Sequence, residues 1–133
     1  MMREMATMNP ETLTLLTFLG RAAVSFYFLW SASFNIIRFA RNVEYLARAG
    51  IRRGGAVLVG AGTIAMTVAS LLFLNPATVV QGGVGLILFT LGSDLLFHRW
   101  WIYRDPNLRI VHQQFACEHL ALSGGIVGLM VAG

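Results

Sequence analysis

The sequence contains no lysine and has little charge of either sign. Its ten basic residues are all arginines, six residues are acidic, and charged residues make up 12% of the 133. A water-soluble domain usually carries about twice that share. Apolar residues account for 56% of the chain, and the mean hydropathy is +0.67. This balance argues against a soluble globular domain and favours a chain that lies in a lipid bilayer.

The chain also lacks the motifs of common redox and hydrolytic chemistry. Its single cysteine, Cys117, excludes an intrachain disulfide and a CxxC thiol pair. The sequence has no heme-attachment motif, no nucleotide-binding loop, and no nucleophile with a positioned base. We therefore expect no covalently bound cofactor and no complete enzyme. The net charge of +4 does not predict nucleic-acid binding, because the arginines flank apolar runs instead of forming a patch on a polar scaffold.

Long apolar runs fill most of the chain. A helix of about 20 residues crosses a hydrocarbon layer about 30 Å thick. We predict one membrane domain over residues 1–133, an all-α bundle of four transmembrane helices. A polar tail, residues 1–12, precedes spans at about 13–37, 54–74, 78–97 and 112–131. The start of the last span is ambiguous between Leu108 and Phe115.

Between the first two spans, Phe39, Val43 and Leu46 recur at helical spacing, with arginines at other positions. This pattern predicts a short interfacial helix on the membrane surface, with an ordinary charged loop as the alternative. At the end of the third span, the pattern of interfacial aromatic residues predicts that Trp100, Trp101 and Tyr103 anchor the chain at the membrane surface.

Pairs of small residues spaced by four predict close helix contacts in lipid. Ala56 and Gly60 form such a pair in the second span, and Gly124 and Gly128 form a GxxxG pair in the fourth. We expect these faces to pack helices within the chain or to join copies of it.

Arginine is concentrated in the connections after the first and third spans. These two connections hold eight of the ten arginines. Because cytoplasmic loops collect Lys and Arg, we expect residues 38–53 and 98–111 in the cytoplasm and both termini outside.

Ionisable residues inside the spans are costly to bury and are usually paired or functional. Arg21 lies eight residues into the first span, and Glu118 in the fourth is its expected ion-pair partner. Asp94 and His98 are four residues apart, and His112 and His119 are seven apart, so each pair shares one helical face. The candidate intramembrane polar site therefore comprises Arg21, Asp94, His98, His112, Glu118 and His119.

Three interpretations of this site stay open. A metal ion suits imidazole and carboxylate groups, but no HxxxH or ExxH pair is present, so we assign no metal. Histidine also suits hydrogen bonding to a quinone head group or proton relay. Hydrogen bonding between helices, without a ligand, is the third interpretation.

Several short motifs resemble the DoxX family of small four-helix membrane proteins. They are Phe97-His98-Arg99-Trp100-Trp101, Asp105-Pro106, Gln113-Gln114-Phe115, Leu120-Ala121-Leu122-Ser123-Gly124-Gly125, Gly20-Arg21 and Phe28-Leu29-Trp30-Ser31. Many relatives carry Lys-Asn where this chain has Glu118-His119. The resemblance implies a four-helix fold, a bacterial cytoplasmic (inner) membrane location and a redox setting, in some relatives linked to quinone.

The sequence thus predicts a membrane subunit of a redox-associated complex, with quinone as its expected ligand. Its expected partners are the lipid bilayer and either other membrane subunits or further copies of itself. Two alternatives stay open. In the first, the chain is an accessory subunit that stabilises a larger membrane assembly. In the second, it is a carrier for a small solute or lipid and uses Arg21 and Glu118.

Overall fold

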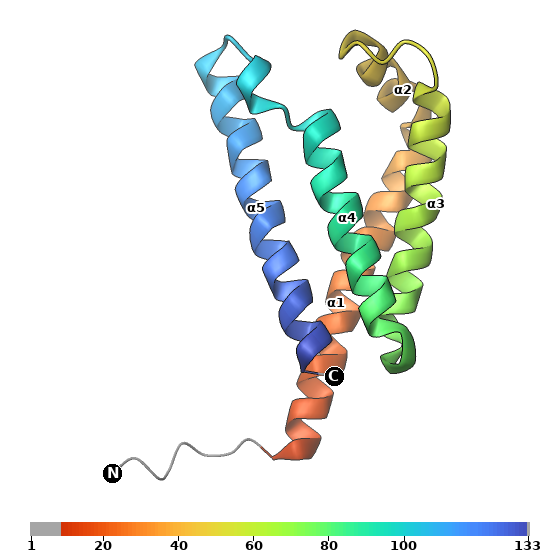
Figure 1. The fold of residues 1–133 in the computed structure, drawn as a ribbon, viewed down its shortest axis with the longest axis vertical. Coiled ribbons are helices and arrows are strands. Elements are labelled where there is room, and N and C mark those ends of the chain that lie inside the picture. Colours follow the sequence, from red (N-terminus) through yellow and green to blue (C-terminus); the bar gives the residue numbers. More distant parts are fainter. Residues whose placement is uncertain (1–8, 133) are drawn as a thin grey trace.

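A computed structural model describes residues 9–132, which form an all-α bundle without any β-strand (Figure 1). This fold confirms the predicted class. Five α-helices and two short 3-10 helices follow one another along the chain: α1 (Pro10–Ile37), α2 (Phe39–Arg48), α3 (Gly55–Leu74), η1 (Pro76–Thr78), α4 (Val79–Phe97), η2 (Trp100–Ile102) and α5 (Pro106–Val131).

Four helical segments are long and apolar enough to cross a membrane. They are Pro10–Ile37, Gly55–Leu74, Pro76–Ile102 and Pro106–Val131, and large apolar side chains lie exposed along all of them. Exposed apolar surface on this scale is unfavourable in water and favourable in lipid. The chain is therefore an integral membrane protein, as the sequence predicted.

Two spans begin earlier than the sequence predicted. In α1, the Asn9 side chain accepts a hydrogen bond from the Glu11 backbone N–H, and Pro10 occupies the first turn. In α5, Asp105 accepts in the same way from the Asn107 backbone N–H, and a proline again follows the cap. A proline at the first helical position needs no backbone donor, so this pattern favours a helix start.

The short helix predicted between the first two spans is present as α2, and its place at the membrane surface stays a prediction. Leu46 is its buried residue and packs beside Gly55 at the start of α3. Gly50 and Gly54 have φ angles of 98° and 79°, in the left-handed region that favours glycine. These two residues let the chain reverse direction between α2 and α3.

The closest helix contacts occur at glycines other than those the sequence singled out. A Cβ atom at Gly82 would overlap the Phe73 backbone of α3, and one at Gly83 would overlap the Met130 side chain of α5. By contrast, a Cβ at Gly124 or Gly128 would meet no atom within 4 Å. The GxxxG pair in α5 therefore packs nothing among residues 9–132, and its role in joining copies stays a prediction.

Ala56 of the other predicted pair lies exposed on α3, and Gly60 comes near only the Phe39 ring. The buried apolar core lies elsewhere, where α1, α3 and α4 pack together and α5 joins them through one side chain. It comprises Phe28, Ala32, Met66, Ala69, Phe73, Val79, Leu86 and Ile126.

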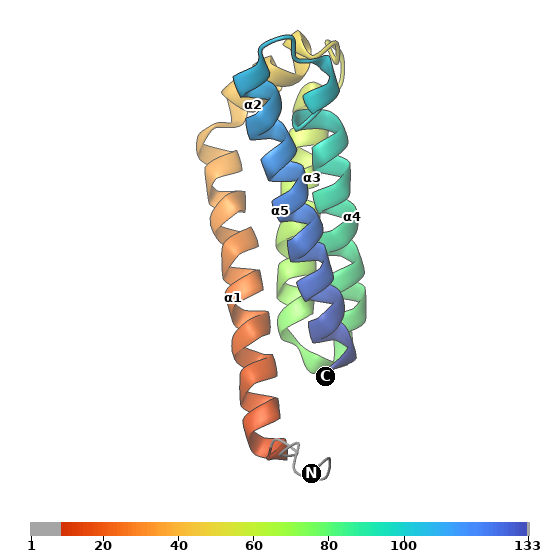
Figure 2. The same ribbon diagram turned by 90° about the vertical axis from the view of Figure 1, so that its left-hand side faces the viewer.

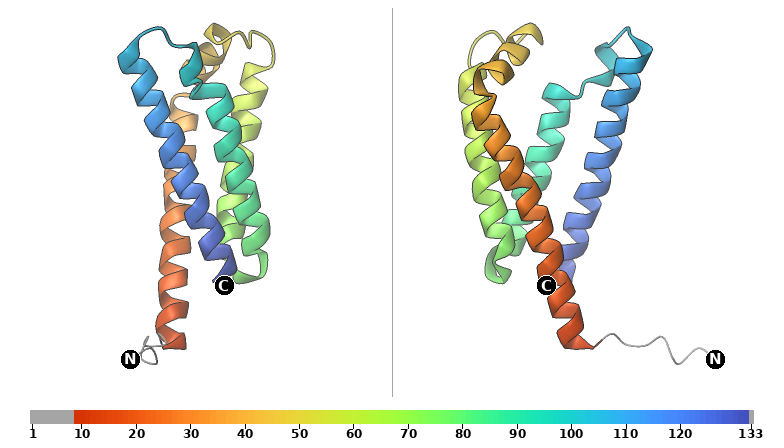
Figure 3. Two further views of the ribbon diagram at one scale, coloured as in Figure 1. Left: turned by 60° about the vertical axis from the view of Figure 1, so that its left-hand side comes forward. Right: turned by 180° about the vertical axis from the view of Figure 1, so that it is seen from behind.

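The bundle is closed at one end and open at the other. At the closed end α5 packs on α4 and α1, and α1 extends beyond the other helices (Figure 2). Towards the opposite end α5 diverges from α1 and α3 (Figures 1 and 3). Only Ser123 and Ile126 are buried in α5. Of the four candidate membrane spans, α5 is therefore the least buried.

Candidate functional site

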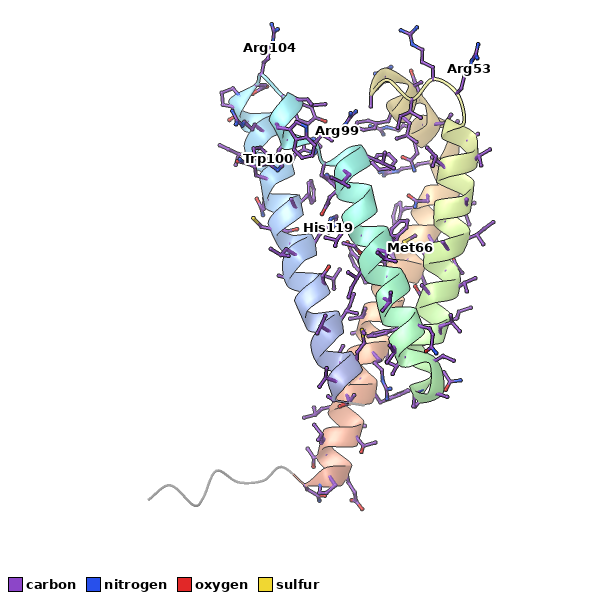
Figure 4. All side chains as sticks on the ribbon, in the orientation of Figure 1. Arg53, Met66, Arg99, Trp100, Arg104 and His119 are labelled. Carbon is purple, nitrogen blue, oxygen red and sulfur yellow. The ribbon has the colours of Figure 1, made fainter. Side chains whose placement is uncertain are left out.

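Both arginine-rich connections lie at the open end of the bundle. Figure 4 shows Arg53 and Arg104 pointing away from the helices at this end, while His119 projects from α5 into the space beside α4. Arg99 instead turns towards α2 and donates a hydrogen bond of 2.8 Å to the Ala49 carbonyl. The polar side chains predicted on α4 and α5 meet just inside this end.

Asp94 and His119 form the innermost pair of this cluster. The Nδ1 atom of His119 lies 2.5 Å from the Asp94 carboxylate, and both side chains are mostly buried. Asp94 lies in the last turn of α4, where the His98 backbone N–H donates to its carbonyl oxygen. A short bond between a histidine and a carboxylate fixes the orientation of the imidazole ring.

His98 is the C-cap of α4 and connects this pair to a third histidine. Its Nδ1 atom lies 3.1 Å from Nδ1 of His112. The His98 ring also packs against Phe115, with 4.9 Å between ring centroids, and edge-on to His119 at 5.3 Å. His98, His112 and His119 thus form one continuous group between α4 and α5.

Two tyrosines extend the group towards α2. The Tyr103 ring stacks on His112 with 4.4 Å between centroids and an angle of 8° between planes. The phenol oxygens of Tyr103 and Tyr45 lie 2.6 Å apart, and Tyr45 also donates to the Phe97 carbonyl. Burial raises the pKa of Tyr45 to about 12, and its hydrogen bond with Tyr103 acts in the same direction.

Two cavities meet at His98 and His119. One, of about 500 Å³, lies among α1, α3 and α4, and its lining includes Met66 and Phe89. The second, of about 350 Å³, lies between α1 and α5. Tyr27, His98 and His119 line both cavities. The larger volume lies within the range of pockets that hold small organic molecules.

The structure brings four of the six predicted polar residues together: Asp94, His98, His112 and His119. Glu118 faces away on the exposed side of α5 and accepts a hydrogen bond from Gln114, although it borders the smaller cavity. A neighbouring position on a helix points about 100° away, so Glu118 and His119 cannot both face α4.

The expected ion pair between Arg21 and Glu118 is absent among residues 9–132. Gly20 packs against Leu129, which follows Glu118 by eleven residues on α5. At 1.5 Å per residue this register separates the levels of the two charges by roughly 16 Å. The prediction failed because it assumed that both charges lie at mid-membrane.

Arg21 is instead buried in the opposite half of the bundle. Its side chain is 4% exposed, and its Nε and Nη1 atoms have no hydrogen-bond partner. One helical turn away, Ser25 donates to the Ser70 carbonyl of α3. Burial of this charge without a partner lowers the stability of the fold, and Arg21 lies apart from the histidine cluster.

The predicted aromatic anchors divide into two kinds. Trp101 is half exposed, and Trp100 lies under the Arg109 guanidinium, 5.6 Å from the ring centroid. Tyr103 instead belongs to the polar cluster. Sequence reasoning missed Tyr45, which lies at a polar position of α2. The available signal was an aromatic residue outside the apolar face that Phe39, Val43 and Leu46 form on α2.

Comparison of the chain with protein-family models, curated proteins and solved structures found no match. The chemistry of the site therefore has to be argued from its own residues. The site offers imidazole nitrogens at the border of an apolar cavity, and a carboxylate and phenols that contact these imidazoles. Such groups can hydrogen-bond a polar head group, transfer protons or bind a metal ion.

Proposed function

We propose that this chain is a DoxX-like membrane subunit of a redox complex, and that it binds the head group of a lipid-soluble quinone. The observation that carries the proposal is the position of His98 and His119, which line both cavities at the open end of the bundle. The DoxX likeness rests on the short motifs in the sequence alone.

The larger cavity has the chemical character that a quinone requires. Its lining is mainly apolar, with Phe28, Met66 and Phe89 beside the space that a flat ring would fill. Imidazole N–H groups of His98 and His119 are suitable donors to a quinone carbonyl, because that oxygen only accepts hydrogen bonds. Binding sites of this kind combine a large apolar wall with few polar groups.

The chain supplies binding and orientation, while the electrons come from elsewhere. Reduction of a quinone to a quinol takes up two electrons and two protons, and the sequence carries no motif for an electron carrier. A partner redox subunit would deliver the electrons. We therefore propose an accessory role within a larger membrane complex.

We further propose a bacterial cytoplasmic membrane location with the open end of the bundle in the cytoplasm. Both arginine-rich connections lie at that end, and the start of α1 and the end of α5 lie at the other (Figure 1). The excess of arginine on one side supports this orientation.

A purely structural subunit is the second candidate function. The exposed Gly124 and Gly128 favour it, because small residues on a lipid-facing helix allow a neighbouring helix to approach closely. The carrier hypothesis receives less support, because Arg21 and Glu118 do not meet.

Photolabelling tests the quinone proposal. The purified chain, kept in chelator to remove metal ions, is labelled with a photoreactive short-chain quinone in lipid nanodiscs. We expect saturable labelling of peptides from α3 and α4, competed by an unlabelled quinone. Replacing His119→Leu removes one donor worth about 1–1.5 kcal/mol, so the dissociation constant should rise roughly tenfold.

Gln114→Ala is the matched control, because Gln114 lies on α5 outside both cavities. This variant should label like the unaltered chain. Labelling that does not saturate, or that is equal in His119→Leu and the unaltered chain, would refute quinone binding at this site. If both variants label normally but a larger complex dissociates when Gly124 or Gly128 is enlarged, the structural role explains the protein better.

A further inference from the structure

We propose that Asp94, His98 and His119 bind one divalent transition-metal ion. One carboxylate oxygen and one ring nitrogen from each histidine lie within 4.8 Å of one another. All three side chains are partly buried, two from the end of α4 and one from α5. The inference does not depend on quinone binding and goes beyond the proposed function.

The donor set suits a transition ion better than magnesium or calcium. Two imidazoles and one carboxylate are the ligands of zinc and of non-heme iron(II) sites, whereas magnesium and calcium take mainly oxygen ligands. The sequence shows neither an HxxxH nor an ExxH pair, yet Asp94 and His98 have the same four-residue spacing on α4 as the histidines of HxxxH. This spacing places both ligands on one face of the helix.

The third ligand comes from α5, and it lies against the first two. His119 Nδ1 is 2.5 Å from the Asp94 carboxylate, and the rings of His119 and His98 are 5.3 Å apart. In a tetrahedral zinc site, ligand atoms lie roughly 3.3 Å from one another. The His119–Asp94 pair thus has to open by less than 1 Å to admit the ion, which takes the place of their shared proton.

A second layer of contacts already orients His98 as a metal ligand. Its Nδ1 atom is engaged with His112, 3.1 Å away, which leaves Nε2 for the ion. The stacked ring of Tyr103 holds His112 in place. Metal-binding histidines almost always use the second ring nitrogen in such a hydrogen bond, which fixes the tautomer and the ring orientation.

Three protein ligands leave coordination positions open to the cavities. His98 and His119 line both cavities, whereas Asp94 borders neither. The ion would therefore be held from one side by the protein and accessible from the other. This arrangement is typical of metal sites that bind an external ligand, while purely structural zinc sites have four protein ligands.

A cobalt titration tests the site. The full-length chain, purified in mild detergent with an affinity tag that lacks histidine, is stripped with chelator and titrated with Co²⁺, and then Zn²⁺ is added in competition. We expect visible absorption that saturates at one ion per chain and that Zn²⁺ abolishes. The Asp94→Asn and His119→Leu variants should each bind Co²⁺ at least roughly 100-fold more weakly, and His112→Gln roughly tenfold more weakly.

Glu44→Gln is the matched control, because it also removes a carboxylate but from the exposed face of α2, where Glu44 pairs with Arg48 outside both cavities. This variant should bind Co²⁺ as the unaltered chain does. Melting curves recorded in chelator separate loss of binding from loss of folding. The absence of saturable binding in the folded, unaltered chain overturns the inference, as does unchanged affinity in folded Asp94→Asn and His119→Leu.

The two proposals can fail separately. The titration contains no quinone, and the photolabelling contains chelator. Co²⁺ binding without quinone labelling supports the metal site and refutes the proposed function. Quinone labelling without Co²⁺ binding supports the proposed function and refutes the metal site.

Discussion

The phenol oxygen of Tyr45 lies 2.6 Å from that of Tyr103 and joins α2 to the connection before α5. The two residues are 58 positions apart in the sequence. A second bond, from Arg99 to the Ala49 carbonyl, links the same two connections. The open end of the bundle is thus held together by contacts between its connections, where the spans themselves diverge.

The Tyr45 phenol predicts a loss of stability at high pH. Burial raises its pKa to about 12, so between about pH 10 and 12 the phenol ionises in the unfolded chain while it stays neutral in the folded chain. The contribution of the neutral phenol to the free energy of unfolding is complete below pH 10 and is lost as the pH approaches 12. Melting temperatures measured in detergent across this range should therefore fall with rising pH.

Tyr45→Phe is the control for this titration. The variant loses the bonds to Tyr103 and Phe97, each worth about 1 kcal/mol, so it should melt at a lower temperature than the unaltered chain at pH 8. Its melting temperature should then fall less steeply between pH 10 and 12. Equal slopes for the two proteins would show that Tyr45 does not titrate as described.

Arg21→Met should stabilise the protein. The change removes a buried guanidinium with two unpartnered nitrogen atoms and keeps an unbranched apolar side chain. We expect the free energy of unfolding to rise by about 1–3 kcal/mol, read from denaturant unfolding in detergent. Arg41→Met on the exposed face of α2 should leave it unchanged. A large decrease for Arg21→Met would mean that the guanidinium has a partner in the membrane.

Gly82→Ala should disrupt the contact between α3 and α4. A Cβ atom at Gly82 overlaps the Phe73 backbone, which cannot move as a flexible side chain would. We expect a loss of about 1–3 kcal/mol in unfolding free energy. Gly92→Ala, on the same helix, meets no atom within 4 Å and should be neutral or stabilising by up to about 1 kcal/mol. Similar melting temperatures for the two variants would contradict this packing.

Reporter fusions test the proposed orientation. Alkaline phosphatase fused after Gly133 should be active and green fluorescent protein at the same point dark, because the reporters require the outside and the cytoplasm respectively. Fusions that replace the chain after Arg53 should give the reverse. Opposite results at both points would invert the proposed topology without changing the fold.

The fold followed from the sequence because lipid imposes one simple requirement. Every backbone N–H and carbonyl in the hydrocarbon layer must be bonded within its own helix, so an apolar run of about 20 residues has few alternatives. The helix starts were predicted less well. Asn9-Pro10 and Asp105-Pro106 are cap signals, and both were assigned to the polar regions outside the spans.

The candidate site was predictable only where helical geometry decides the contact. Asp94 and His98 share a face by their spacing alone, but the meeting of this face with His119 depends on how α4 and α5 pack. The pairing of Arg21 with Glu118 failed for the same reason. The register between helices is set by contacts such as Gly20 against Leu129 and Gly83 against Met130, which no periodicity within one helix reveals.

The divergence of α5 from α1 determines how a molecule would reach His119. The smaller cavity lies between these two helices and is bordered by Tyr27 on one side and Leu122 on the other. A hydrophobic compound dissolved among the acyl chains would arrive sideways, without crossing water or a headgroup layer. Occupancy of the histidines would then follow the compound's concentration in the membrane and would be nearly insensitive to its aqueous solubility.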